Sequence, residues 1–463
     1  MVTVTKLYSV KRFANGVARI YINDTQLLDK IGLKARTPIR VDYQEHGIRV
    51  VPDHHGTKSV MDCGRGALLE LRNKETYKSV GDVDSVAVKF TSKGVEIGLR
   101  YTDKQRLKRE AAMLKSLAEG KPIRTASLFS GIGLLTLFLK NGLKAAGIAS
   151  QITLANDSCP KAMDANLAGN PVWDDAAEDA QAIIDSIDNI DLNSINQADL
   201  VEIGYPCIAL SKLCREENRD VKHPVVGHLF IKVIEVLRKL NPAMMVFENV
   251  PTFVNSETFR FITSELTDYR FESVILNGHD FGGIEGRPRA CVIAVSKGLP
   301  ATQITTLKPP VEIKHPPLSH FLEPMSLSSP MWKEMLHVKR KADNPKLNFK
   351  NCAYHGHETL IATITATYAS PKAGAPMVLH PTTPSLQRQL TEREHAHIRQ
   401  MPPRLFNAVM DIANGISSVV SRRGSVSAVH RMLGNSVSKC WEFVGEHLGN
   451  YLSQFTLDAQ QAA

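Results

Sequence analysis

Cys207 is the residue of this chain best placed to act as a nucleophile. It follows the apolar run 198–204 and comes directly after Pro206, a residue that stiffens the turn. A cysteine at the boundary between a strand and a loop is more open to reaction than one inside an apolar run, and its thiolate is the attacking form. A buried structural cysteine is the alternative interpretation, and Cys214, in a polar segment, is a weaker candidate.

A carboxylate and two arginines could assist such a nucleophile. Glu248 follows the apolar run 244–247, where burying a carboxylate without a partner costs several kcal/mol, so we expect it to have a functional role. Arg287 and Arg289 alternate at the start of another apolar run, which points both side chains to one side. They could hold a phosphate and a carboxylate or base oxygen, and an ordinary surface pair is the alternative.

A glycine turn and an acidic residue indicate a cofactor site. The turn consists of Phe129, Ser130, Gly131, Ile132 and Gly133. Its glycines let the backbone approach a ligand, and the helix that follows favours a negative group at its start. Asp157, with Ser158 after it, ends the next apolar run and suits a pair of ribose hydroxyls. A helix N-cap is the alternative for Asp157. Residues 433–437 are interpreted as turn residues leading into a C-terminal helix.

The elements that must position these residues alternate between strand and helix from residue 123 onward. The expected strands are 123–129, 152–156, 198–204, 243–249, 272–278 and 290–296, with helical stretches between several of them, such as 133–142 and 226–240. This order predicts an α/β fold with a mostly parallel sheet and helices on both faces. Ligands of such sheets bind at the carboxyl ends of the strands, so the residues above should meet at one edge.

The rest of the chain follows other patterns. We expect a β-rich N-terminal domain with a DNA-binding or regulatory role over 1–101, a linking helix over 102–122 and a core over 123–299. A recognition region follows over 300–385, and its C-terminal part and the return to the core occupy 386–455. In the N-terminal part, 18–24, 37–43 and 47–52 are expected strands, 25–33 a short helix, and 85–90 with 95–100 a hairpin. Residues 18–52 resemble the swapped-hairpin DNA-binding domains of bacterial transition-state regulators, and a small β-rich interaction domain is the alternative.

The linking helix is amphipathic and basic. Thr102 or Asp103 can cap its start. Its expected apolar face holds Leu107, Ala111, Leu114 and Leu117, and its basic residues are Lys104, Arg106, Lys108, Arg109 and Lys115. We favour a solvated basic face over a phosphate-binding one.

Composition narrows the class of protein. The net charge of +9 and a pI near 9.1 fit a polyanion partner. No apolar run reaches the roughly 18 residues of a membrane helix, and the N-terminus lacks a secretion signal, so we expect a cytoplasmic protein. The seven cysteines form no CxxC pair and indicate reduced thiols. Cys352, His355 and His357 lack a fourth ligand, so we expect no metal site.

In their order along the chain, these segments resemble the cytosine-5 DNA methyltransferase family. FSGxG at 129–133, the Pro-Cys pair at 206–207, ENV at 248–250, RxR at 287–289 and GNSV at 434–437 resemble its motifs I, IV, VI, VIII and X. Residues 388–402 resemble motif IX, and the likeness covers about 123–450. The sequence departs from the family at Ile208, where Gln is common, at Ser127, usually acidic, at Leu134, usually Gly, and at Glu285, usually Gln.

The resemblance implies a Rossmann-like methyltransferase core, a small target-recognition domain, and S-adenosylmethionine as cofactor. The implied cofactor contacts are Phe129, Ser130, Gly131, Gly133, Asp157, Ser158, Asp179, Asn435 and Val437. Cys207 would add to the ring of a flipped-out cytosine, Glu248 would bind ring nitrogen 3, Arg289 the base oxygen and Arg287 the sugar–phosphate backbone. Residues 363–366 resemble the TxTA element of the recognition region.

The implied partner is duplex DNA, bound by a monomer with no membrane involved. The protein would serve restriction-modification beside a cognate endonuclease, or act as an orphan methylase. Two alternatives stay open: an RNA methyltransferase of the same fold that acts on tRNA, and a DNA-binding regulator whose methylase core is silent.

Overall fold

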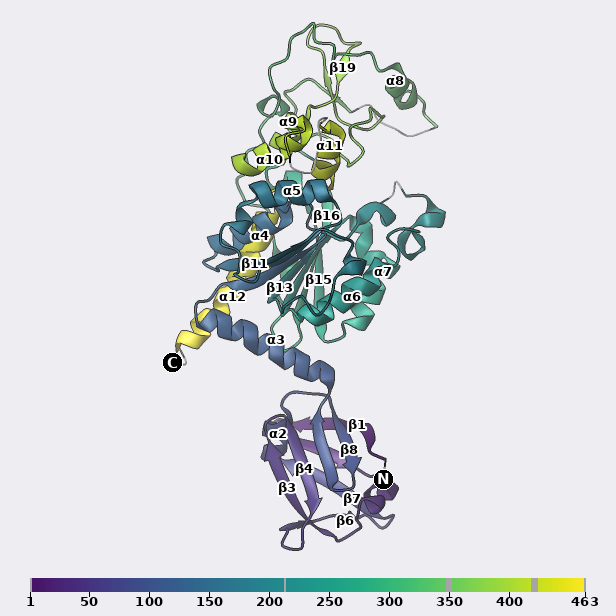
Figure 1. Cartoon of the computed structure of the whole chain (residues 1–463), viewed down its shortest axis with the longest axis vertical. Helices are drawn as coiled ribbons and strands as arrows, with labels where there is room; N and C mark the ends of the chain where they lie inside the picture. Colours follow the sequence, from purple (N-terminus) through teal and green to yellow (C-terminus); the bar gives the residue numbers. More distant parts are fainter. Residues whose placement is uncertain (1, 212–213, 347–351, 418–423, 462–463) are drawn as a thin grey trace. The chain divides into compact units, whose positions relative to one another are not determined.

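The chain divides into two compact units, Met1–Lys108 and Arg109–Ala463 (Figure 1). The structure is a computed structural model and describes residues 2–211, 214–346, 352–417 and 424–461. Among these residues, no helix combines the length and the apolar character needed to span a membrane.

The first unit is built on a nine-stranded antiparallel sheet in the order β5-β3-β4-β9-β8-β1-β2-β7-β6. Its elements are β1 (Val4–Phe13), β2 (Val17–Ile22), α1 (Thr25–Lys30), β3 (Pro38–Gln44), β4 (Gly47–Pro52), β5 (Lys58–Ser59), β6 (Met61–Asp62), β7 (Ala67–Asn73), α2 (Lys74–Val80), β8 (Ser85–Thr91) and β9 (Gly94–Leu99). Apolar residues of alternate strand positions, among them Ile20, Leu71 and Val88, form its own core. The expected strands and the hairpin are confirmed.

The resemblance to a swapped hairpin does not hold. Strand β2 pairs with β1 and β7, whereas β3 and β4 pair with each other. Strands β9, β8 and β1 lie between β4 and β2 in the sheet. Residues 18–52 are therefore parts of one larger sheet and form no unit of their own.

Helix α3 (Tyr101–Ala118) matches the core of the expected linking helix. Its apolar face was predicted only in part: Leu117 is buried and Leu107 and Leu114 are half-buried, as expected. Thr102 and Asp103 lie inside its first turn and so do not cap it. Ala111 is exposed, while Arg106 and Arg109 are buried. Arg109 pairs with Asp268 at 2.8 Å. Periodicity counts apolar residues only, so it missed arginines whose N–H groups find buried acceptors.

The second unit contains a seven-stranded sheet in the order β12-β11-β10-β13-β14-β16-β15. Its strands are β10 (Ile123–Leu128), β11 (Ser150–Asn156), β12 (Gln181–Ile183), β13 (Leu200–Ile203), β14 (Met244–Asn249), β15 (Tyr269–Asn277) and β16 (Pro288–Ser296). The first five in the order are parallel, and β16 runs antiparallel to β14 and β15. The mostly parallel sheet and six of its strands are thus as predicted, and only the short β12 was missed.

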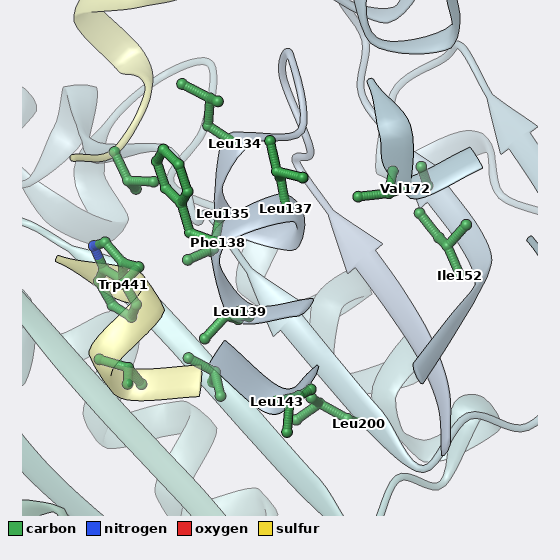
Figure 2. Packing of buried hydrophobic residues seen from close by; sticks show 14 of the residues in the cluster. Leu134, Leu135, Leu137, Phe138, Leu139, Leu143, Ile152, Val172, Leu200 and Trp441 are labelled. Atoms are coloured by element: carbon green, nitrogen blue, oxygen red, sulfur yellow. The ribbon is translucent and has the colours of Figure 1, made fainter. Parts of the chain in front are cut away.

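Helices cover both faces of this sheet. They are α4 (Leu134–Ala145), α5 (Pro160–Gly169), α6 (Leu229–Leu240), α7 (Glu257–Glu265), α10 (Pro403–Asn414) and α12 (Trp441–Gln461). Residues of α4 and α12 share one apolar cluster with the sheet, and residues of α6 and α7 share the other. Figure 2 shows Phe138 and Leu139 of α4 near Trp441 of α12. The two helices touch backbone to backbone, because a Cβ on Gly142 would lie 2.0 Å from the carbonyl oxygen of Glu442.

The expected recognition region contains little regular structure. It holds α8 (Leu336–Ala342), β17 (Ala353–Tyr354) and β18 (Met377–Leu379). The two strands form a three-stranded sheet with β19 (Gln387–Arg388), just beyond the region, and a small apolar cluster lies among them. Helices α9 (Glu392–Ile398) and α11 (Val426–Asn435) follow it along the chain. The prediction that 433–437 form a turn is wrong at its start, because Gly434 and Asn435 are the last residues of α11.

Candidate active site

Cys207 stands at the carboxyl edge of the sheet, one turn beyond β13. It opens a short 3₁₀ helix, Cys207–Ala209, and its side chain is half-buried. The turn before it is fixed from two sides. The side chain of Asn249, at the end of β14, donates to the carbonyl oxygen of Tyr205 at 3.0 Å, and the Tyr205 ring packs edge-on against Phe129 at 5.7 Å between centroids. The thiol is therefore held at a defined place near the glycine turn.

Glu248 and Arg289 form the ion pair beside this thiol. Arg289 Nε lies 3.0 Å from Glu248 Oε1, and Glu248 is buried with its backbone in register with Cys291 of β16. Burial raises the pKa of Glu248, and the two arginines, Arg289 and Arg287, only partly offset that effect. A carboxyl whose pKa is raised in this way binds a proton more readily than a free one.

The pKa of the Cys207 thiol is also raised. Burial is the main cause, the charge of Glu248 adds to it, and the positive charges of Arg289 and Arg287 oppose it. All three charged groups thus act on the sulfur, which ties them into one electrostatic site. The thiol form predominates at neutral pH, so the attacking thiolate has to be formed in the course of the reaction.

The structure corrects the role expected for Arg287. Its side chain is 2% exposed, and its two terminal nitrogens donate to the carbonyl oxygens of Ile364 at 3.2 Å and Gly434 at 2.6 Å. Those bonds use the groups that would have held a sugar–phosphate backbone. Arg287 instead joins the start of β16 to the recognition region and to the end of α11, while its charge still reaches Cys207 and Glu248.

Glu285 is the centre of a buried charge network. It pairs with Arg287 at 3.4 Å and with Arg399, and its Oε1 accepts the backbone N–H of Ile364 at 2.7 Å. Burial alone would raise the pKa of Glu285, but Arg399 and Arg287 hold it at about 2. The departure from the family at Glu285 therefore has a local reason, since Arg399 faces it and needs a counter-charge.

The glycine turn has the geometry expected of a ligand loop. Phe129, Gly131 and Gly133 have φ values of 58°, 55° and 75°. A Cβ on Gly133 would lie 2.3 Å from Asn170 Nδ2, whereas no heavy atom lies within 4 Å of the same position on Gly131. Only glycine therefore fits at position 133, whereas position 131 borders open space.

Asp157 braces this turn. Its two carboxylate oxygens accept the backbone N–H groups of Gly131 and Cys159, each at 2.8 Å, and it makes no side-chain cap to α5. Burial raises its pKa. Each carboxylate oxygen keeps a second lone pair for a hydroxyl, so Asp157 beside the open space at Gly131 fits the ribose of an adenosyl cofactor. Ser158, next to it, is exposed.

The placement expected for Asp179 is wrong. Asp179 precedes β12 and pairs with Arg124, at the start of β10, at 2.7 Å. It therefore lies at the amino ends of the parallel strands, opposite to Gly131 and Asp157. The acidic residue that follows the carboxyl end of β12 is Asp185, whose carbonyl oxygen accepts from the Asn156 side chain at 2.9 Å. The short β12 gave no periodic signal, so its two ends could not be told apart.

The two C-terminal candidates differ in exposure. Asn435 is exposed at the end of α11. Val437 is buried in the apolar cluster that also contains Ile132 and Leu134 of the glycine-turn region. The structure thus brings the C-terminal segment to the same side of the sheet as the glycine turn.

Glu202 is the functional candidate that the sequence analysis missed. It lies in β13 in register with Ser127 of β10 and accepts a hydrogen bond from Thr136 in the first turn of α4. It is fully enclosed, and burial raises its pKa to about 7. The position that is usually acidic in the family is serine here, and a carboxyl stands beside it on the next strand. A charged residue inside the run Leu200–Ile203 was the signal.

The fold and this edge define an α/β protein with a half-buried cysteine, a carboxylate–arginine pair and a glycine turn at the carboxyl edge of a mostly parallel sheet. The chain matches the family model of C-5 cytosine-specific DNA methylases over residues 123–439, and it belongs to that family. The expected cofactor, S-adenosylmethionine, agrees with that membership.

Individual relatives are distant. The chain is 29% identical over 195 residues to the type II methyltransferase M1.HgaI of Avibacterium volantium, which covers 38% of this chain and 51% of that protein. It is 25% identical over 182 residues to the orphan methyltransferase M.SPRI of Bacillus phage SPR, 38% of each protein. The matched segments thus span about half or less of these relatives.

Among solved structures, the chain is similar to the Dnmt2 methyltransferase of S. pombe. The two are 18% identical with a TM-score of 0.49, over 73% of this chain and 98% of that one.

Proposed function

We propose that the protein transfers a methyl group from S-adenosylmethionine to carbon 5 of a cytosine in duplex DNA through a covalent bond to Cys207. The observation that carries the proposal is the Glu248–Arg289 ion pair, whose two charges act on the half-buried Cys207 sulfur. Cytosine carbon 5 is a poor nucleophile, and covalent catalysis turns one hard step into two easier ones. The target base has to leave the stack, since the ring cannot be reached inside a duplex.

The residues of this chain divide the chemistry as follows. Cys207 loses its proton to a solvent water, and its sulfur bonds to ring carbon 6, while the ring electrons move toward nitrogen 3. Glu248 gives its proton to nitrogen 3, which neutralises the adduct and leaves carbon 5 electron-rich. Arg289 keeps Glu248 in place. Of the five N–H groups of its guanidinium, the contacts to Glu248 and to the Pro288 carbonyl use two.

The bound cofactor supplies an electrophilic methyl group on a positively charged sulfur. Carbon 5 would accept that methyl group, and the electron pair of the broken methyl–sulfur bond would remain with the cofactor. A solvent water then takes the carbon 5 proton. The electron pair of that bond forms the double bond between carbons 5 and 6 and expels the Cys207 thiolate, and nitrogen 3 returns its proton to Glu248. Phe129, Ser130, Gly131, Gly133 and Asp157 would hold the cofactor, with Asp185 in the place expected for Asp179.

The test measures transfer of a labelled methyl group from S-adenosylmethionine to duplex DNA and, in parallel, to tRNA. The wild type should label cytosine carbon 5 in the duplex. Cys207→Ala should abolish the transfer, whereas Cys214→Ala should retain it, because the Cys214 thiol donates to the Asn218 carbonyl within its own loop. Transfer by Cys207→Ala, or label on tRNA alone, would contradict the proposal.

We also propose that the protein acts on specific sequences as a monomer, either beside a cognate endonuclease or as an orphan methylase. Sequencing 5-methylcytosine in a host that expresses the protein identifies the recognised sequence. Methylation without any sequence preference would contradict this part of the proposal.

A further inference from the structure

Nearly all of the excess positive charge of the chain lies in the first unit. Residues 1–108 hold 20 Lys and Arg against 12 Asp and Glu, a net charge of +8, which leaves +1 of the total +9 for residues 109–463. The unit with the proposed active site is therefore close to neutral. A polyanion is attracted mainly to the unit to which no function has been assigned.

Three basic residues form a row across one face of the nine-stranded sheet. The register pairs Lys11 of β1 with Arg19 of β2, and Arg19 with Arg72 of β7. Paired residues of neighbouring strands point to the same face, and the strands lie about 4.8 Å apart. Lys11 and Arg72 are exposed and Arg19 is half-buried. We call these three residues the basic row.

Two aromatic rings support the row from the same face. The Lys11 ammonium lies 5.5 Å and the Arg72 guanidinium 4.7 Å from the centre of the Phe13 ring. The Arg19 guanidinium lies 4.6 Å from the Tyr21 ring, which is 39% exposed. Such contacts restrict long, mobile side chains to a few positions, so the row presents its charges already ordered.

The row is under-neutralised, unlike several other basic residues of the same unit. Arg19 pairs with Glu70 at 2.5 Å, but among the described residues no carboxylate pairs with Lys11 or Arg72. By contrast, Arg40 contacts both Asp42 and Asp53. Like charges at directly opposite positions of a sheet destabilise it. An anion bound across the row would remove that repulsion.

We propose that the basic row binds the phosphate backbone of the duplex DNA that serves as substrate. The inference rests on the proposed function for the identity of the polyanion. Duplex DNA carries one negative charge per roughly 1.7 Å of its axis, so a row about 10 Å long spans several phosphates. The contact is independent of sequence, because it involves no base edges.

The experiment measures binding of the full-length protein to a fluorescein-labelled duplex of about 30 base pairs by anisotropy, without cofactor, at several salt concentrations. The variant is Lys11→Gln with Arg19→Gln and Arg72→Gln. Its matched control is Arg49→Gln with Arg65→Gln and Lys93→Gln, three exposed residues of the same unit outside the row. Both variants lose the same charge, and thermal melting followed by circular dichroism verifies that both fold.

Each lost phosphate contact lowers the slope of log K against log salt by about 0.9. The row variant should therefore lose about 2 to 3 from the slope and bind at least tenfold more weakly at 150 mM salt. The control should lose less than 1. Lys11→Gln alone, at an exposed site, should lower the slope by about 0.9 and serves if the triple variant does not fold.

Equal slopes for the row variant and the control would overturn the inference. Because no cofactor is present, the result is separate from the proposed function. A wild type that binds the duplex through the row without methylating it would refute the proposed function alone. If the protein methylates the duplex but the row variant binds it as the control variant does, only this inference is refuted.

Discussion

Glu285→Gln tests whether the buried charge network holds the recognition region to the start of strand β16. The substitution keeps the shape of the side chain and the acceptor for the Ile364 N–H, but removes the charge that faces Arg399 and Arg287. It also introduces the residue that is common in the family. We still expect a loss of stability, because both arginines then lie buried without a counter-charge.

The size of the effect follows from the pKa of Glu285. The folded protein lowers this pKa from 4.5 to about 2. A tenfold change in a proton-binding constant corresponds to about 1.4 kcal/mol, so the ionised form contributes about 3 kcal/mol to stability. Since the folded pKa is the lower one, this stability is fully present above pH 4.5 and is lost as the pH falls toward 2. The difference between wild type and variant should be constant from pH 5 to 8.

Urea unfolding followed by tryptophan fluorescence measures this difference for the second compact unit, residues 109–463. All three tryptophans, Trp173, Trp332 and Trp441, lie within residues 109–463, so the signal does not report on the first unit. Glu323→Gln is the matched control. Glu323 pairs with Arg393 at 2.7 Å near the surface, where such a pair contributes about 0 to 1 kcal/mol.

Equal unfolding free energies for Glu285→Gln and Glu323→Gln would refute this reasoning. The reasoning would also fail if Glu285→Gln lowered the unfolding free energy by the same amount in wild type and in an Arg399→Gln variant, because the two residues would then not be coupled.

The remaining predictions concern the catalytic edge. Glu248→Gln should lower single-turnover methylation by about 10²- to 10⁴-fold, since nitrogen 3 loses its proton donor. The raised pKa of Cys207 should make its alkylation by iodoacetamide, measured without DNA, rise steadily from pH 7 to 9; a plateau below pH 8 would contradict this. Gly133→Ala should weaken cofactor binding at least tenfold in calorimetry, because its Cβ meets Asn170 at a positive φ. Glu202, with its pKa raised to about 7, destabilises the fold as the pH rises from 4.5 to 7. Glu202→Gln should therefore gain stability relative to wild type over that range, and a constant difference in urea unfolding would refute it.

The sequence predicted the parts of the fold that depend on short-range patterns. Strands β10, β11, β13 and β14 are mostly apolar, and each ends in, or is followed within two positions by, a polar residue or glycine, so both the strands and their tips could be found. The glycine turn, Cys207 and Glu248 follow from those tips. Their positions along the chain were sufficient because parallel strands bring their carboxyl ends to one edge.

Long-range partners could not be predicted in the same way. Arg287 is a residue of a type that often binds phosphate. Its side chain is instead buried and bonded to the carbonyl oxygens of Ile364 and Gly434, which lie far along the chain. The surroundings of Glu202 could not be predicted either, because its neighbour Ser127 lies on another strand. Asp179 was misplaced since a strand of three residues has no readable period.

The backbone contact between α4 and α12 has a consequence for synthesis of the protein. Helix α4 directly follows the glycine turn, and besides the sheet it packs on a surface that belongs to residues 441–461, far along the chain. During translation, the glycine turn leaves the ribosome some 300 residues before helix α12 exists. Nascent chains should therefore stay unable to bind S-adenosylmethionine until residues 441–461 have emerged, and termination before residue 441 should yield a binding-deficient product.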